Sequence, residues 1–146
     1  MKKISTLSSF SVLAACLITV NLVLPLNAIA ATGSRVEPGA DPTFQAGKKT
    51  FGRYCAKCHG KGADGEGRMA RLYRKLQTQL PSNFTIGVYL SRPDIYLREV
   101  ISKGGAASAM SQYMPPFGEE LSQEQIDNLV HFIKRTPELH GFSPEK

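Results

Sequence analysis

The stretch CAKCHG at residues 55–60 decides the fold of this chain: Cys55 and Cys58 are followed directly by His59. Residues three apart on a helix lie about one turn apart on the same face, so both thiols can reach one ligand. Four glycines between residues 60 and 67 forbid a regular helix beyond this point, and we expect a loop there. Two thiols beside an imidazole are typical of a redox dithiol, a zinc site or a covalently attached cofactor.

The neighbouring sequence separates these alternatives. A redox dithiol needs a strand before it and a helix N-terminus under the first cysteine, whereas a helix is expected before Cys55 and glycines follow. A zinc site needs two more soft ligands, and only His131 and His140 remain. C-x-x-C-H is the attachment sequence of c-type haem, in which two thiols add to the porphyrin vinyl groups. We therefore expect one haem c, bound covalently at Cys55 and Cys58, with His59 as the proximal iron ligand.

The remainder of the chain carries helical patterns and no convincing strand alternation. Ser91, with Pro93 and Asp94 behind it, and the capping box that opens at Ser122 are helix start signals. The expected helices are residues 43–54; residues 68–80, with Met69, Leu72, Leu76 and Leu80 as an apolar stripe; Ser91 to Gly104; and Ser122 to Pro137. The predicted fold class is all-α, with three to five short helices.

The N-terminal 30 residues have the features of a secretory signal peptide. Lys2 and Lys3 precede a long apolar stretch, which ends in the small-x-small sequence Ala28-Ile29-Ala30. We expect cleavage after Ala30 and export to the periplasm. Two alternatives stay open: lipidation of Cys16 in the sequence LAAC, or retention of the stretch as a membrane anchor.

Composition and charge fit one small globular domain. Of the 146 residues 42% are hydrophobic and 21% charged, which excludes wholesale disorder and a multi-span membrane fold. The formal charge is +6, and removal of residues 1–30, with two lysines and no acid, leaves 16 basic and 12 acidic residues. The predicted organisation is a flexible linker at 31–42, a helical domain at 43–136 and a tail at 137–146.

Over residues 43–136 the sequence resembles the class I cytochrome c family. The resemblance rests on Gly47, Phe51, CAKCHG at 55–60, MPPFG at 114–118 and LSQEQIDNLVHFIKR at 121–135. It implies a cytochrome c fold, with helices wrapped around one haem. It also implies that Gly47 and Phe51 of the first helix pack against Phe132 of the last. The family often supplies a proline after the attachment site to orient the histidine, but residues 65–68 contain none, so the acceptor of the His59 ring proton stays unassigned.

The same resemblance implies a methionine as the sixth iron ligand, in the loop before the last helix. Met114 matches the family pattern, and its two following prolines stiffen the loop. Met110 is the rival, in a more flexible segment. A His/Met pair raises the reduction potential and closes the sixth site, which suits outer-sphere electron transfer.

Basic residues flank the attachment site. They are Arg53, Lys57 and Lys61, followed by Arg68, Arg71, Arg74 and Lys75. They form either a positive ring that steers an acidic redox partner or an ordinary solvated face. We expect no nucleic-acid binding by an exported haem protein. His131 and His140 are predicted to be surface residues, and Asp64 and Glu66 a solvated turn.

The predicted function is that of a periplasmic monohaem one-electron carrier, not an enzyme. A dedicated electron-transfer subunit of a dehydrogenase or reductase complex would carry the same residues. A peroxidase-like or ligand-sensing haem would need an open sixth site, which Met114 argues against. A thiol oxidoreductase would hold no haem.

Overall fold

A computed structural model describes residues 36–144. The predicted signal peptide and its alternatives, lipidated Cys16 and a retained anchor, lie outside these residues. The described part is helical and contains no strand, which confirms the all-α prediction. Within it, no helix is both long and apolar enough to span a bilayer. The α-helices are α1 (Pro42–Tyr54), α2 (Ala56–His59), α3 (Ala70–Lys75), α4 (Asp94–Ala107) and α5 (Gln123–Arg135), and the 3-10 turns are η1 (Pro38–Ala40), η2 (Gly87–Leu90) and η3 (Thr136–His140).

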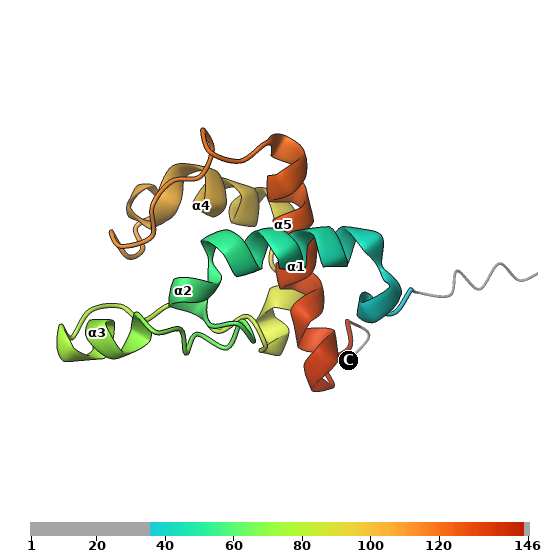
Figure 1. The fold of residues 1–146 in the computed structure, drawn as a ribbon, viewed down its shortest axis with the longest axis horizontal. Coiled ribbons are helices and arrows are strands. Elements are labelled where there is room, and N and C mark those ends of the chain that lie inside the picture. The colour runs from blue at the N-terminus through green and yellow to red at the C-terminus, as the bar shows by residue number, and fades with distance from the viewer. Residues whose placement is uncertain (1–35, 145–146) are drawn as a thin grey trace, which may run out of the picture. The chain divides into compact units, whose positions relative to one another are not determined.

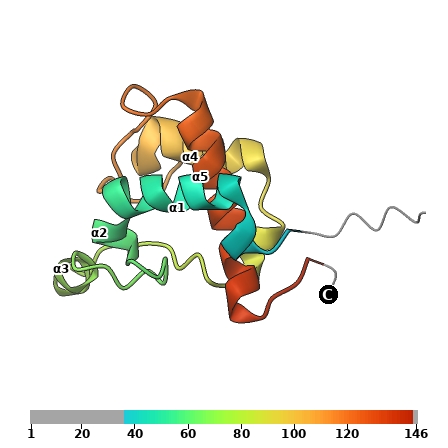
Figure 2. The same cartoon turned by 45° about the vertical axis from the view of Figure 1, so that its right-hand side comes forward.

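The crossing of α1 and α5 is the centre of the fold, as Figures 1 and 2 both show. A Cβ atom on Gly47 would lie 2.0 Å from the Asn128 carbonyl oxygen of α5, so only glycine allows this approach. The ring of Phe132 lies 5.0 Å from that of Phe44 and 4.9 Å from that of Phe51, measured between centroids. The packing that the family resemblance implied for Gly47, Phe51 and Phe132 is therefore present.

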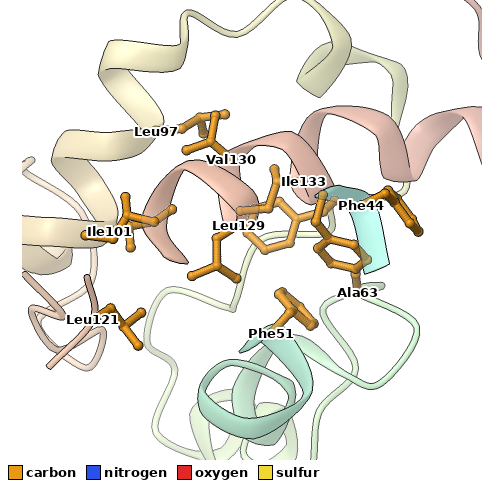
Figure 3. Packing of buried hydrophobic residues seen from close by; sticks show 12 residues of the cluster. Phe44, Phe51, Ala63, Leu97, Ile101, Leu121, Leu129, Val130 and Ile133 are labelled. Atoms are coloured by element: carbon orange, nitrogen blue, oxygen red, sulfur yellow. The ribbon is translucent and has the colours of Figure 1, made fainter. Parts of the chain in front are cut away.

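Helix α5 begins at the predicted capping box. The Ser122 hydroxyl accepts from the Gln125 N–H at 3.2 Å, and the Gln125 side chain accepts from the Ser122 N–H at 2.9 Å. One face of α5 then packs against α1 and α4, and Figure 3 shows these apolar side chains meeting. The buried residues of α5 are Ile126, Leu129, Val130, Phe132, Ile133 and Arg135.

The helix predicted at residues 68–80 is shorter than expected. Helix α3 spans only Ala70–Lys75, and the backbone of Gln77 turns left-handed, with φ of 52°, which ends the helical path. Its buried residues are Ala70 and Tyr73. The leucines of the predicted apolar stripe are exposed and form no core face: Leu72 is exposed by 44%, Leu76 by 51% and Leu80 by 44%.

The start of α4 also differs from the prediction. Pro93, rather than Ser91, is the N-cap residue, and it makes no side-chain cap. The Ser91 hydroxyl instead donates to the Val88 carbonyl at 3.3 Å. At the other end, the predicted stop at Gly104 is a kink: Gly104 has φ of 78°, and one further helical turn follows it.

Both ends of the helical unit are more firmly packed than a linker and a tail. Asp41 caps α1 by accepting from the N–H groups of Thr43 and Phe44. Its carboxylate also accepts from Arg135 Nη1 at 2.6 Å, and Pro137 is fully buried. Residues 38–42, expected in the linker, therefore belong to the packed structure, as does the start of the predicted tail.

Candidate haem-attachment site

The two cysteines and the histidine lie at the junction of α1 and α2. The helical hydrogen bonds continue across it: the Cys55 N–H donates to the Phe51 carbonyl at 2.8 Å, and the His59 N–H donates to the Cys55 carbonyl at 2.9 Å. Gly60, with φ of 81°, then ends the helix. Both thiols are free and partly buried. The structure thus presents the motif on one helical turn.

The imidazole of His59 is held on two sides. Its Nδ1 atom lies 3.0 Å from the Ser82 carbonyl oxygen, and its ring stacks on Phe84 at 4.8 Å with an interplanar angle of 24°. Burial lowers the pKa of His59, and the bond to Ser82 opposes this only in part. The side chain is therefore neutral at physiological pH, and with Nδ1 donating to Ser82 its Nε2 atom carries the lone pair that a metal ligand needs.

Two cavities lie beside this turn, with empty volumes of about 620 Å³ and about 680 Å³ when the solvent at their mouths is included. Mostly apolar side chains line both. Ligand and cofactor pockets of folded proteins are mostly apolar in the same way. The residues common to both cavities are Cys55, His59, Ser82, Met110, Met114 and Phe117, while Cys58 lines the first.

The loop that carries both methionines is seated on Gly104 and Gly105. The Gly105 N–H donates to the Met114 carbonyl at 3.0 Å, and the Met110 N–H donates to the Gly105 carbonyl at 2.8 Å. A Cβ atom on Gly104 would lie 2.8 Å from the Pro116 nitrogen, and one on Gly105 would lie 2.3 Å from the Ser111 carbonyl oxygen. The loop thus requires both glycines and brings both predicted methionine candidates to the cavities.

The requirements of a c-type haem are two adjacent thiols, a neutral imidazole with one free nitrogen, and an apolar cavity beside them. The residues present meet all three.

The sequence profile described as cytochrome c oxidase, cbb3-type, subunit III matches residues 42–133. The chain belongs to this family of class I cytochrome c domains. It is also 31% identical over 88 residues to cytochrome c-554(547) of Halothiobacillus neapolitanus, a match that covers 60% of this chain and 90% of that protein.

The protonation of Cys55 also fits a cytochrome c better than a redox dithiol. Burial, with a smaller contribution from neighbouring Cys58, raises the pKa of Cys55 to about 12. Reactive dithiols lower the pKa of their attacking thiol, because the thiolate is the nucleophile. In the folded chain Cys55 is a neutral thiol at physiological pH, the opposite of what disulfide exchange requires.

Several residues of this cytochrome site were not foreseen from the sequence. Ser82 supplies the carbonyl that was sought in the loop at 65–68; its only signal is the neighbouring Pro81. Tyr73 lies beside the cysteines, with its hydroxyl 3.7 Å from the Cys58 Sγ atom, and stacks on Tyr113 at 5.1 Å. Aromatic rings thus close the cavity on the side of Cys58.

The other predicted polar residues lie outside both cavity linings. His131 is partly exposed, and its Nε2 atom lies 2.7 Å from an Asp41 carboxylate oxygen. Asp64 accepts from the Glu66 N–H at 2.9 Å in an exposed turn, and Glu66 pairs with Arg74. Lys57 and Lys61 are exposed beside the attachment turn.

Proposed function

We propose that this chain is a monohaem c-type cytochrome that carries single electrons between redox proteins. In this proposal Cys55 and Cys58 would hold the haem through two thioether links, and His59 and Met114 would bind its iron. The observation that carries it is that all four side chains line one cavity in a chain of the cytochrome c family. Membership of that family supports electron transfer as the general activity.

The residues of the chain would serve such a carrier by keeping the proposed iron ligands in fixed positions. When bound, a haem supplies an iron that gains or loses one electron. The Ser82 carbonyl fixes the ring of His59, and Gly105 fixes the backbone of Met114. Apolar side chains such as Phe117 exclude water, and no side chain needs to move a proton. A rigid, dry site of this kind keeps reorganisation on electron transfer small.

A second candidate, a dedicated electron-transfer subunit of a larger complex, has one observation in its favour. The matching family is described as a subunit of an oxidase. The residues described here serve both roles equally. Purification from the native membrane under mild conditions separates them, because a subunit copurifies with its complex at fixed stoichiometry and a free carrier does not.

Export and an acidic partner complete the proposal. The features of residues 1–30 support delivery to the periplasm. Lys57 lies between the two attachment cysteines and is exposed, so positive charge lies beside the place where an electron would leave. N-terminal sequencing of the mature protein tests cleavage after Ala30.

Spectra of two variants test the axial ligand. Met114→Ala removes the proposed sixth ligand, and Met110→Ala removes the other methionine of the cavity. We expect the weak near-infrared-edge absorption band of methionine-ligated ferric haem in the wild type and in M110A, and its loss in M114A. Survival of that band in M114A would show that Met114 is not the ligand.

A further inference from the structure

The cavity contains two methionines where one sulfur can bind the iron. Met110 and Met114 line both cavities. The backbones of both are hydrogen-bonded to the same residue: the Gly105 carbonyl accepts from the Met110 N–H at 2.8 Å, and the Gly105 N–H donates to the Met114 carbonyl at 3.0 Å. The backbone therefore brings both residues to the site and does not by itself select one of them.

The side chains differ in one contact. The Tyr96 hydroxyl of α4 donates to the Met110 Sδ atom at 3.5 Å. Among the residues that the structure describes, Met114 Sδ receives no such hydrogen bond. This hydrogen bond restrains the Met110 side chain, because the bond must break before the sulfur can move to another position.

The surroundings keep Tyr96 and Met110 in place. The Arg92 guanidinium lies over the Tyr96 ring, 5.3 Å from its centroid, and Tyr96 lines the second cavity. Ala109, directly before Met110, has φ of 53°, a left-handed conformation that alanine adopts only where its surroundings impose it. The turn that carries Met110 is thus held in a defined place.

We propose that Tyr96 is a positioning residue that holds the sulfur of Met110 at the cavity wall and so leaves the axial position to Met114. The inference rests on the proposed function, since it needs an iron that both sulfurs can reach. Without the Tyr96 hydroxyl, Met110 gains freedom to compete. The net free energy of a hydrogen bond between uncharged groups corresponds to a change of about 2- to 10-fold in the equilibrium constant of such a competition.

Imidazole titrations of the haem-loaded protein, followed by absorbance, test this. In M114A the sixth position is open to imidazole and to Met110. Adding Tyr96→Phe keeps the ring and removes the hydroxyl, so we expect imidazole to bind about 2- to 10-fold more weakly in Y96F/M114A than in M114A. The matched control repeats the pair with Met110→Leu, where Y96F has no competing sulfur to release and leaves the affinity unchanged.

Proton NMR of the reduced proteins gives a second readout. A methionine bound to haem iron has its methyl protons shifted strongly upfield by the porphyrin ring current. We expect that signal to gain intensity in Y96F/M114A relative to M114A and to be absent when Met110→Leu is added. Equal imidazole affinities with and without the Tyr96 hydroxyl, or the same change in the M110L background, would overturn the inference. Failure of the proposed ligation looks different: wild type and M114A would then bind imidazole equally well.

Discussion

The Nδ1 atom of His59 lies 3.0 Å from the carbonyl oxygen of Ser82, a residue 23 positions later in the chain. The intervening loop is closed by the backbone: the Gly65 N–H donates to the His59 carbonyl at 2.8 Å, and the Gly67 N–H donates to the Cys58 carbonyl at 3.2 Å. The orientation of the proposed axial histidine therefore depends on a loop that lacks regular secondary structure over most of its length.

Gly65→Ala should disturb this support. Gly65 has φ of 81°, and a Cβ atom there would lie 2.8 Å from the Pro81 carbonyl oxygen, next to Ser82. We expect the free energy of unfolding of the haem-loaded protein to fall by about 1–2 kcal/mol, measured by guanidinium titration. A weakened bond to Ser82 makes the imidazole less basic, so the reduction potential should rise. Gly62→Ala is the matched control, because its Cβ would meet only the flexible carboxylate of Asp64, at 3.4 Å. Equal effects of the two variants would show that the loop at Gly65 does not support His59.

A pair of glycine substitutions within α1 tests the helix crossing. Gly47→Ala places a methyl group 2.0 Å from the Asn128 carbonyl oxygen, whereas Gly52→Ala meets nothing within 4 Å. We expect G47A to lower the free energy of unfolding by about 1–3 kcal/mol or more. G52A should raise it by about 0.5–1 kcal/mol through helix propensity. Thermal denaturation followed by circular dichroism measures both, and a harmless G47A would mean that α1 and α5 cross elsewhere.

The buried Asp41 carboxylate should make stability fall in acid. A hydrogen bond from His131, followed by those from the Phe44 N–H and Arg135, holds the pKa of Asp41 well below its usual range, against the effect of burial. A lowered folded-state pKa stabilises the native state above the unfolded pKa of about 3.9, and that stabilisation is lost as pH falls below it.

Asp41→Asn isolates this contribution because asparagine still caps a helix. We expect D41N to be less stable than the wild type by about 1–3 kcal/mol near pH 6, with the difference shrinking below about pH 4. Denaturant titrations at several pH values measure it. Glu119→Gln, on an exposed loop, is the matched control for removal of a carboxylate charge. A D41N difference that stays constant from about pH 6 to about pH 2 would rule the mechanism out.

Lys57 should contribute to the approach of an anionic partner. Lys57→Glu reverses an exposed charge between Cys55 and Cys58, while Lys103→Glu reverses one on α4 that pairs with Glu99 at 3.0 Å. Both variants change the net charge equally. With an anionic iron complex as oxidant, we expect K57E to slow stopped-flow oxidation about 2- to 5-fold at low salt and K103E to slow it less. Indistinguishable rates would favour the ordinary solvated face.

The parts of the fold that could be predicted are those set by short-range signals. The capping box at Ser122 indicated the start of α5. The packing of Gly47 and Phe51 against Phe132, in contrast, joins two distant helices and was implied only by the family resemblance. The length of α3 was overestimated for two reasons. The helical spacing of Leu72 and Leu76 does not show whether another element packs on these side chains. The left-handed backbone at Gln77, which ends the helix, is not signalled by the residue type.

The candidate site shows the same division. Cys55, Cys58, His59 and Met114 belong to motifs, and the fold places all four around one cavity. Ser82 contributes a backbone carbonyl. Because every residue type has one, the side chain at position 82 does not predict this contact with His59. Gly104 and Gly105 end a helix in the sequence pattern, but their contacts to the methionine loop depend on the folded chain.

The proposed function requires a haem that is attached covalently through Cys55 and Cys58. Its most direct test is the intact mass of protein expressed with a c-type maturation system and extracted with acidified acetone. We expect a red precipitate whose polypeptide mass is increased by one haem, and we expect C55A/C58A to lose that increase. A colourless polypeptide of unmodified mass, with the pigment in the acetone, would contradict it.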